Sequence, residues 1–276
     1  MERIILLFIM LAQLSCASQY QQGLIFRVQY KPETKYSQTI EQTSQSEIKY
    51  IGSKEFLQTL KDKNILNPTI TKSHSIIEAI VSTGKLIDGM YFPLRMEFIK
   101  TTSNDGKTII PNGTIIYGKS TVGNVPTLDS ITSTGLNEEY KKVILQTMRG
   151  AFAQIKFPDK KLKVGDEFTI DSPLSIPIAE ATVEMAITTN YKLISILNGI
   201  ADFDISQVYA MKSKVIKYPI KATGNGKGKL LYDIANNFWR KYQIETEMEM
   251  NTTFDNFKLD TRSSGSLTQT TVITTK

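Results

Sequence analysis

Three glutamates that alternate along one segment are the first side chains in this sequence that could do chemistry. Glu245, Glu247 and Glu249 would point to one side of a β-strand, spaced about 7 Å apart. Calcium usually takes its oxygen ligands from a sharply turned loop, and glycoside hydrolysis needs two carboxylates that converge in a cleft. We therefore expect a solvated strand face, and we place a carboxylate-based hydrolase last among the functions considered below.

The other residues that could take part in catalysis or binding are a single histidine and a glycine-rich segment. His74 has no nucleophile-elbow motif to serve, and one histidine cannot supply the several ligands of a zinc site. Gly224–Gly228 resembles a phosphate loop, but Lys229–Asp233 after it predicts a strand where such a loop would open a helix. We expect a hairpin or a bulged strand start there. The sequence thus predicts no catalytic residue, no metal site, no cofactor and a protein that is not an enzyme.

The first 17 residues are typical of a signal peptide. Arg3 precedes the apolar run 4–11, which is shorter than the about 20 residues that span a bilayer. Two processing sites remain open: cleavage after Ala17, or lipidation of Cys16, which lies where a bacterial lipoprotein carries its anchor. We expect export to the periplasm or, through Cys16, association with the outer membrane as a lipoprotein; secretion is the alternative.

The remaining chain, 18–276, has the composition of a globular domain. Hydrophobic residues make up 41% of the whole chain and charged residues 22%. The net charge of +6 comes from scattered lysines, with no basic stripe among aromatic residues, so we expect no nucleic-acid partner. The domain has no cysteine and must be stabilised by core burial, which its length permits.

Alternating patterns predict that this domain is mainly β. Tyr242–Met250 alternates apolar with polar residues, the clearest strand signal in the chain. Asn198-Gly199 between two apolar runs predicts a hairpin. Tyr36–Tyr50 is polar and rich in Thr, Ser and Gln, which suits an exposed or edge strand.

Two helices are predicted as well. Ser53 is a good N-cap for a short helix, and a long amphipathic helix is expected over 136–155. Its expected apolar face consists of Leu136, Tyr140, Val143, Ile144, Met148, Ala151, Phe152 and Ile155. We predict a mainly β (α+β) fold, with a curved antiparallel sheet or open half-barrel and the long helix packed across it. It would form a single β-rich domain, or two β halves around 136–155.

Several segments also follow one another in a recognisable order. They are Cys16, Tyr36–Gln45, the long helix, Phe157-Pro158, Lys163–Phe168, Asn198–Ala201, Gly224–Asp233 and Ile244–Met250. In this order they resemble an uncharacterised family of exported bacterial proteins and lipoproteins of the Bacteroidota. The resemblance implies export and supplies no catalytic residues. A looser likeness, in architecture alone, is to the curved antiparallel half-barrels of lipoprotein carriers.

The expected architecture suggests a place for an apolar ligand. A helix laid over a curved sheet can leave a slot that side chains do not fill, and methionine adapts to varied apolar shapes. We therefore predict a non-enzymatic cell-envelope protein that binds a lipid or other apolar or amphiphilic ligand. The methionines expected to line it are Met96, Met148, Met185, Met248 and Met250. The alternative is a structural or assembly module that binds an envelope protein partner.

Overall fold

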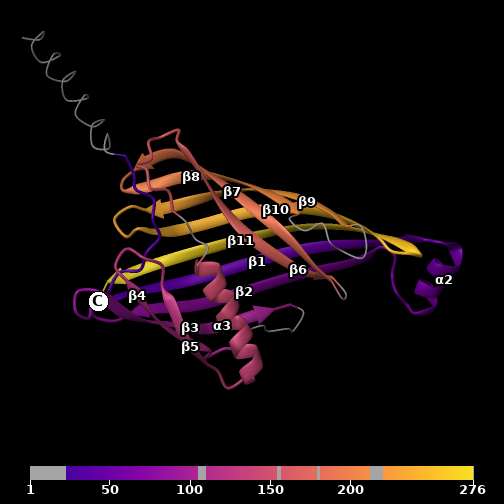
Figure 1. Cartoon of the computed structure of the whole chain (residues 1–276), viewed down its shortest axis with the longest axis horizontal. Helices are drawn as coiled ribbons and strands as arrows, with labels where there is room; N and C mark the ends of the chain where they lie inside the picture. Colours follow the sequence, from indigo (N-terminus) through magenta and orange to yellow (C-terminus); the bar gives the residue numbers. More distant parts are fainter. Residues whose placement is uncertain (1–22, 105–109, 154–156, 179–180, 212–219, 276) are drawn as a thin grey trace, which may run out of the picture.

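One antiparallel sheet of eleven strands forms most of the molecule (Figure 1). The computed structural model describes residues 23–104, 110–153, 157–178, 181–211 and 220–275. The strands are β1 (Thr34–Gly52), β2 (Thr69–Thr83), β3 (Tyr91–Ser103), β4 (Ile115–Thr121), β5 (Thr127–Thr132), β6 (Glu167–Ile178), β7 (Ala181–Leu197), β8 (Ile200–Met211), β9 (Ile220–Asp233), β10 (Phe238–Thr253) and β11 (Phe257–Thr275). The sheet is not closed into a barrel, and the predicted fold class is confirmed.

The sheet consists of two meanders that meet at its centre. Strands β1 to β5 follow one another outward in one direction, and β11 back to β6 do so in the other. The first and last strands pair with each other along their whole length, from Thr34–Thr275 to Gly52–Phe257. The β7–β8 hairpin turns at Asn198-Gly199, where both residues have positive φ (50° and 76°), as the sequence predicts.

The two faces of the sheet differ in chemistry. The sheet curves toward the side on which α3 (Glu138–Ala153) lies, which we call the concave face (Figure 1). Ile244 points to the concave face and is only 5% exposed, whereas Glu245 and Glu247 are exposed on the opposite, convex face. This confirms the predicted alternation of β10.

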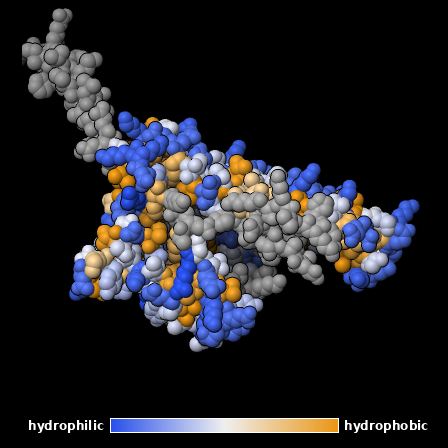
Figure 2. All heavy atoms as spheres, in the orientation of Figure 1, coloured by the Kyte–Doolittle hydropathy of each residue, from blue (hydrophilic) through white to orange (hydrophobic). Residues whose placement is uncertain are grey.

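An extended segment, residues 23–33, crosses the concave face near one end of the sheet, and we call it the strap. Leu24, Phe26 and Tyr30 are buried against the sheet, whereas Ile25 between them is 46% exposed. Within the described residues, the strap forms the β-bridge Leu24–Leu162, and the backbone N–H groups of Gln29 and Glu33 donate to the carbonyls of Asn237 and Gly84. Hydrophobic residues gather on this face near the end of the sheet at which the C-terminus lies (Figure 2). The main core is therefore enclosed at one end of the sheet and not along its full length.

The two helices have different relations to the sheet. Helix α2 (Lys54–Asp62) begins at the predicted cap, where the Ser53 side chain accepts a hydrogen bond from the backbone N–H of Phe56. Helix α3 connects the two edge strands, β5 and β6, and contacts β5. Among the described residues, no helix is long and apolar enough to cross a membrane.

The predicted apolar face of α3 is partly wrong. Tyr140 and Val143 are 62% and 54% exposed, and the helix contacts the core through Leu145, Met148 and Phe152. The helix starts later than expected, because the Asn137 side chain accepts from the N–H of Tyr140. Leu136 precedes the helix, and Ile155 lies outside the described residues. A helix seated beside an edge strand buries a narrower stripe than one laid across the middle of a sheet.

The polar stretch expected as an exposed or edge strand is β1, which is largely exposed from Thr39 onward but lies at the centre of the sheet and not at an edge. It pairs with β2 on one side and β11 on the other. Its hydroxyls find partners on both neighbours: Ser44 Oγ lies 2.6 Å from Ser73 Oγ, and Ser263 donates to Ser46 at 3.2 Å. Cross-strand hydroxyl pairs and a complete backbone ladder can stabilise such a strand without apolar residues.

The glycine-rich segment is neither a hairpin nor a strand start. It lies inside β9, paired with β8 and β10 throughout. A side chain at Gly228 would clash with the backbone carbonyl of Gln243, so the two strands approach too closely there for any other residue.

Candidate ligand-binding site

A cavity of about 300 Å³ lies between the strap and the part of the sheet that runs from β6 to β11. Phe26 enters it from the strap, with ring centroids 4.9 Å from Phe168 and Tyr232 and 5.3 Å from Phe203. We call it the aromatic cavity; it is lined by Phe26, Val28, Phe157, Ile170, Ser172, Thr189, Tyr191, Gln207, Leu230, Trp239, Tyr242 and Gln269.

Trp239 reaches the aromatic cavity because of a β-bulge. The register of β10 against β9 shifts between Trp239 and Lys241, so Trp239 and Tyr242, three residues apart, line the same cavity. The indole Nε1 is buried, and no hydrogen-bond partner for it exists in the described part of the chain. A buried donor without a partner costs about 1–3 kcal/mol.

Gln207 of β8 forms the polar boundary of the aromatic cavity. Its Nε2 donates to Thr189 Oγ1 at 3.0 Å and approaches the Tyr242 hydroxyl at 3.5 Å, while Tyr209 donates to Gln207 Oε1 at 2.9 Å. Gly226 leaves room for this amide, since a Cβ there would lie 3.2 Å from Gln207 Oε1. The side chains of Gln207, Thr189, Tyr209 and Tyr242 therefore satisfy one another's hydrogen bonds, and they place amide and hydroxyl groups along the cavity wall.

A second hollow of about 360 Å³ continues from the aromatic cavity along the concave face. The two share Gln207 and Tyr242, so they form one path across the sheet from β6 to β1. We call this hollow the polar groove; it is lined by Gln42, Thr43, Ser44, Gln207, Tyr209, Tyr242, Ile244, Thr246, Met248, Ser263, Ser264, Gly265, Ser266 and Leu267. Among the described residues, neither hollow is lined by an acid, a lysine, an arginine or a histidine.

The tyrosines around these hollows stay neutral. Burial raises the pKa of Tyr191 to about 12 and also raises the pKa of Tyr209. Burial, together with the nearby phenols of Tyr191 and Tyr209, raises the pKa of Tyr242. Ionised phenolates are therefore excluded at ordinary pH, and the path from cavity to groove carries no charge.

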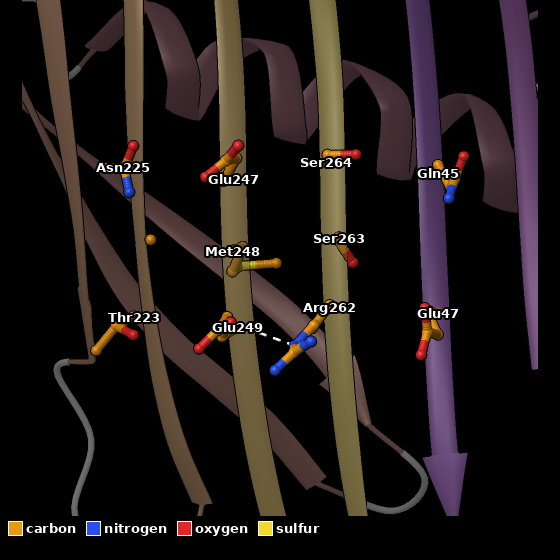
Figure 3. A pocket seen from close by; sticks show the side chains of 11 residues that line it. Gln45, Glu47, Thr223, Asn225, Glu247, Met248, Glu249, Arg262, Ser263 and Ser264 are labelled. Carbon is orange, nitrogen blue, oxygen red and sulfur yellow. Dashed lines mark ion pairs between the residues drawn. The ribbon is translucent and has the colours of Figure 1, made fainter. Parts of the chain in front are cut away.

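Charged groups collect on the convex face instead. An open hollow of about 390 Å³ lies there. Figure 3 shows Glu47 on β1, Glu247 and Glu249 on β10 and Arg262 on β11 around it. Arg262 Nε is 3.3 Å from Glu249 Oε1, an exposed ion pair. Within the described ranges no group of acids, histidine or cysteine could hold a metal ion. His74 Nε2 also lies on the surface, 3.0 Å from Glu41 Oε1.

The five methionines proposed as ligand contacts fall into separate groups. Met185, Met248 and Met250 pack together near the far end of the concave face, with Met185 fully buried. Met96 and Met148 belong to the core beneath α3. Met248 lines the polar groove, and none of the five lines the aromatic cavity. The aromatic cavity thus lies beneath the strap and not beneath the long helix.

Trp239, Gln207 and Tyr242 are the site residues that sequence reasoning missed. The sequence shows Trp239 beside Phe238, a pair more typical of a core. The aromatic residues at 239 and 242 break the period of two, and that break was the available signal for a bulge.

Residues 1–17 and Cys16 lie outside the described residues, so lipidation stays a prediction. No family model matches the chain, and no curated protein matches it.

Proposed function

We propose that this chain is a non-enzymatic cell-envelope protein that binds one apolar or amphiphilic molecule on the concave face of its sheet. The observation that carries the proposal is the aromatic cavity, which continues into the polar groove. A volume of about 300 Å³ is at the lower end of the range of about 300–1,000 Å³ for small-molecule sites, and the groove adds space for a larger ligand. Export through residues 1–17 is part of the proposal.

The chemistry of the two hollows suits a molecule with one apolar and one polar part. Phe26, Phe157 and Leu230 offer an apolar surface, and burying a hydrocarbon chain there gains about 0.8 kcal/mol for each CH₂ group. The groove offers hydroxyl and amide groups beside it. A ligand would therefore place its hydrocarbon part beneath the strap and its polar part toward β1 and β11.

Trp239 makes the proposal directly testable, because it is the only tryptophan of the chain and lines the cavity. Bromine quenches indole fluorescence on contact, so 11-bromo-1-undecanol serves as the probe. We expect saturable quenching with one site for each chain.

A matched pair of variants on β6 provides the control. Ser172→Phe fills the cavity and should weaken the probe at least tenfold, whereas Thr169→Phe places the same side chain on the exposed convex face and should not. Thermal unfolding of both variants checks that the fold is intact. Quenching that does not saturate, or that is equal in the two variants, would overturn the proposal.

An assembly module that binds an envelope protein is the second candidate. Apolar side chains are exposed near α2: Leu66 is 74% and Ile70 is 54% exposed. Such residues at one end of a molecule are typical of a contact surface. Failure of the quenching titration would favour this candidate over the first.

A further inference from the structure

Apolar side chains are exposed in the turns at one end of the sheet. This is the end at which the strap and the C-terminus lie, and we call it the loop end (Figure 1). In the β2–β3 loop, Leu86, Ile87 and Met90 are 42%, 40% and 59% exposed, and Val122 of the β4–β5 loop is 55% exposed. We call these four residues the tip patch. We propose that the tip patch inserts into the surface of a lipid bilayer, so that the protein contacts the membrane with its loop end.

The composition of these two loops is unusual for turns. Turn positions favour Gly, Pro, Asn, Asp and Ser, and apolar residues exposed together mark a contact with a protein or a membrane. The two loops are joined, because the N–H of Val122 donates to the carbonyl of Met90 at 3.4 Å. The β2–β3 loop is also closed on itself, since the N–H of Ile87 donates to the carbonyl of Tyr91 at 2.7 Å. The tip patch is therefore carried on backbone that hydrogen bonds hold in place.

The position of residue 23 favours a membrane as the partner. The described chain begins at Gly23, at the loop end (Figure 1), and the strap ends at Glu33, whose N–H donates to the carbonyl of Gly84 beside the tip patch. The residues before Gly23 include the apolar run 4–11 and Cys16, where the sequence predicts lipidation. The chain from Cys16 to Gly23 spans at most about 25 Å. A bilayer that holds a lipid on Cys16 would thus lie within that distance of the loop end.

Other loops at this end expose apolar side chains as well. Leu197, the last residue of β7, is 70% exposed, and Val164 is 60% exposed. The N–H of Gly165, next to Val164, donates to the carbonyl of Leu193 on β7 at 2.8 Å, so the two loops are neighbours. Apolar contacts spread along one end of the molecule suit an extended surface such as a bilayer. The opposite end, at α2, exposes Leu66 but lies away from residue 23 (Figure 1).

A fluorescent label that reports contact with acyl chains tests the inference in the full chain. Cys16→Ser removes the only cysteine, and Ile87→Cys or Leu66→Cys then places one NBD label at the loop end or at the opposite end. The labelled chains are reconstituted with vesicles of phosphatidylcholine that carries a nitroxide quencher on its acyl chain. We expect the label at position 87 to be quenched about threefold more strongly than the label at position 66. No quenching at position 87, or equal quenching at both positions, overturns the inference.

The tip patch itself is tested with Leu86→Ser and Met90→Ser together in the chain labelled at position 87. We expect quenching to fall to about half or less at an unchanged Tm, because both side chains are exposed. Val122→Ser, on the other loop, should also lower the quenching. Unchanged quenching in these variants would show that the N-terminal segment alone brings position 87 to the vesicle, and it would overturn the inference.

Two other occupants of the tip patch are detected without vesicles. A label at position 87 whose emission rises with protein concentration indicates a second copy of the chain. A label that is shielded at every concentration indicates that another segment of the same chain covers the patch. Either result overturns the inference. The inference goes beyond the proposed function, and its failure leaves that function standing, because the aromatic cavity is followed separately through Trp239.

Discussion

Phe26 should contribute more to stability than any other residue of the strap. Its ring is 3% exposed and lies within 6.1 Å, centroid to centroid, of five other rings. Truncating a buried phenylalanine to alanine typically costs about 3–5 kcal/mol. Edge-to-face contacts such as the one to Phe203, at an interplanar angle of 68°, favour the upper part of that range. We therefore expect Phe26→Ala to lower the free energy of unfolding by at least about 3 kcal/mol.

The adjacent residue offers a matched control. Ile25 is 46% exposed and points away from the sheet, so Ile25→Ala should cost less than about 1 kcal/mol. Urea unfolding of both variants, followed by Trp239 emission, measures the difference. Because Phe26 also lines the cavity beside Trp239, its loss should admit water and shift the folded-state emission to longer wavelength. Equal losses at the two positions, or an unshifted emission in Phe26→Ala, would show that the strap is not held by this face.

Two further predictions concern the sheet. Ile244→Asp should lower the free energy of unfolding by about 3 kcal/mol or more, because it leaves an unpaired charge buried. Glu247→Gln, on the exposed face, should cost about 0.5 kcal/mol or less, and similar losses for the two variants in urea unfolding would mean that the faces of β10 are misassigned. Asp233 is buried, which opposes its ionisation, but hydrogen bonds from Arg240 and Asn236 outweigh this and hold its pKa below the ordinary value. Its stabilising effect is therefore complete above the unfolded pKa of about 4 and is lost as the pH falls through the folded pKa. Asp233→Asn should cost about 2 kcal/mol at pH 7 and progressively less as the pH falls below about 4, and a difference from wild type that does not depend on pH would refute the role of the ionised carboxylate.

Local patterns predicted the parts of the fold that depend on neighbours in sequence. The alternation of Tyr242–Met250 identified a strand with one buried face, because side chains on a strand must alternate. Asn198-Gly199 identified a hairpin, because its turn requires positive φ at both residues. Ser53 identified the start of α2 for the same kind of local reason.

Features that depend on distant segments were not predictable in this way. The polar sequence of β1 predicted an exposed or edge strand; the strand is exposed over much of its length, but it is central because β11, more than two hundred residues later, pairs with it. The aromatic cavity depends on the strap, whose Phe26 meets Tyr232 of β9. The bulge at Trp239 is a departure from regular pairing that a periodic pattern cannot express. The five methionines do pack in or against buried clusters. The flexibility of methionine, however, does not show where a cavity lies, and none of the five lines the aromatic cavity.

Native mass spectrometry of the full chain, purified from its own host, tests the central claim most directly. We expect the wild-type protein to carry one small molecule whose mass and fragmentation identify an apolar or amphiphilic compound. The same molecule should be retained by Thr169→Phe and lost from Ser172→Phe, since only the latter fills the aromatic cavity. A wild-type protein that carries no small molecule, or one that remains bound equally in Ser172→Phe, would contradict the claim that the concave face is a binding site.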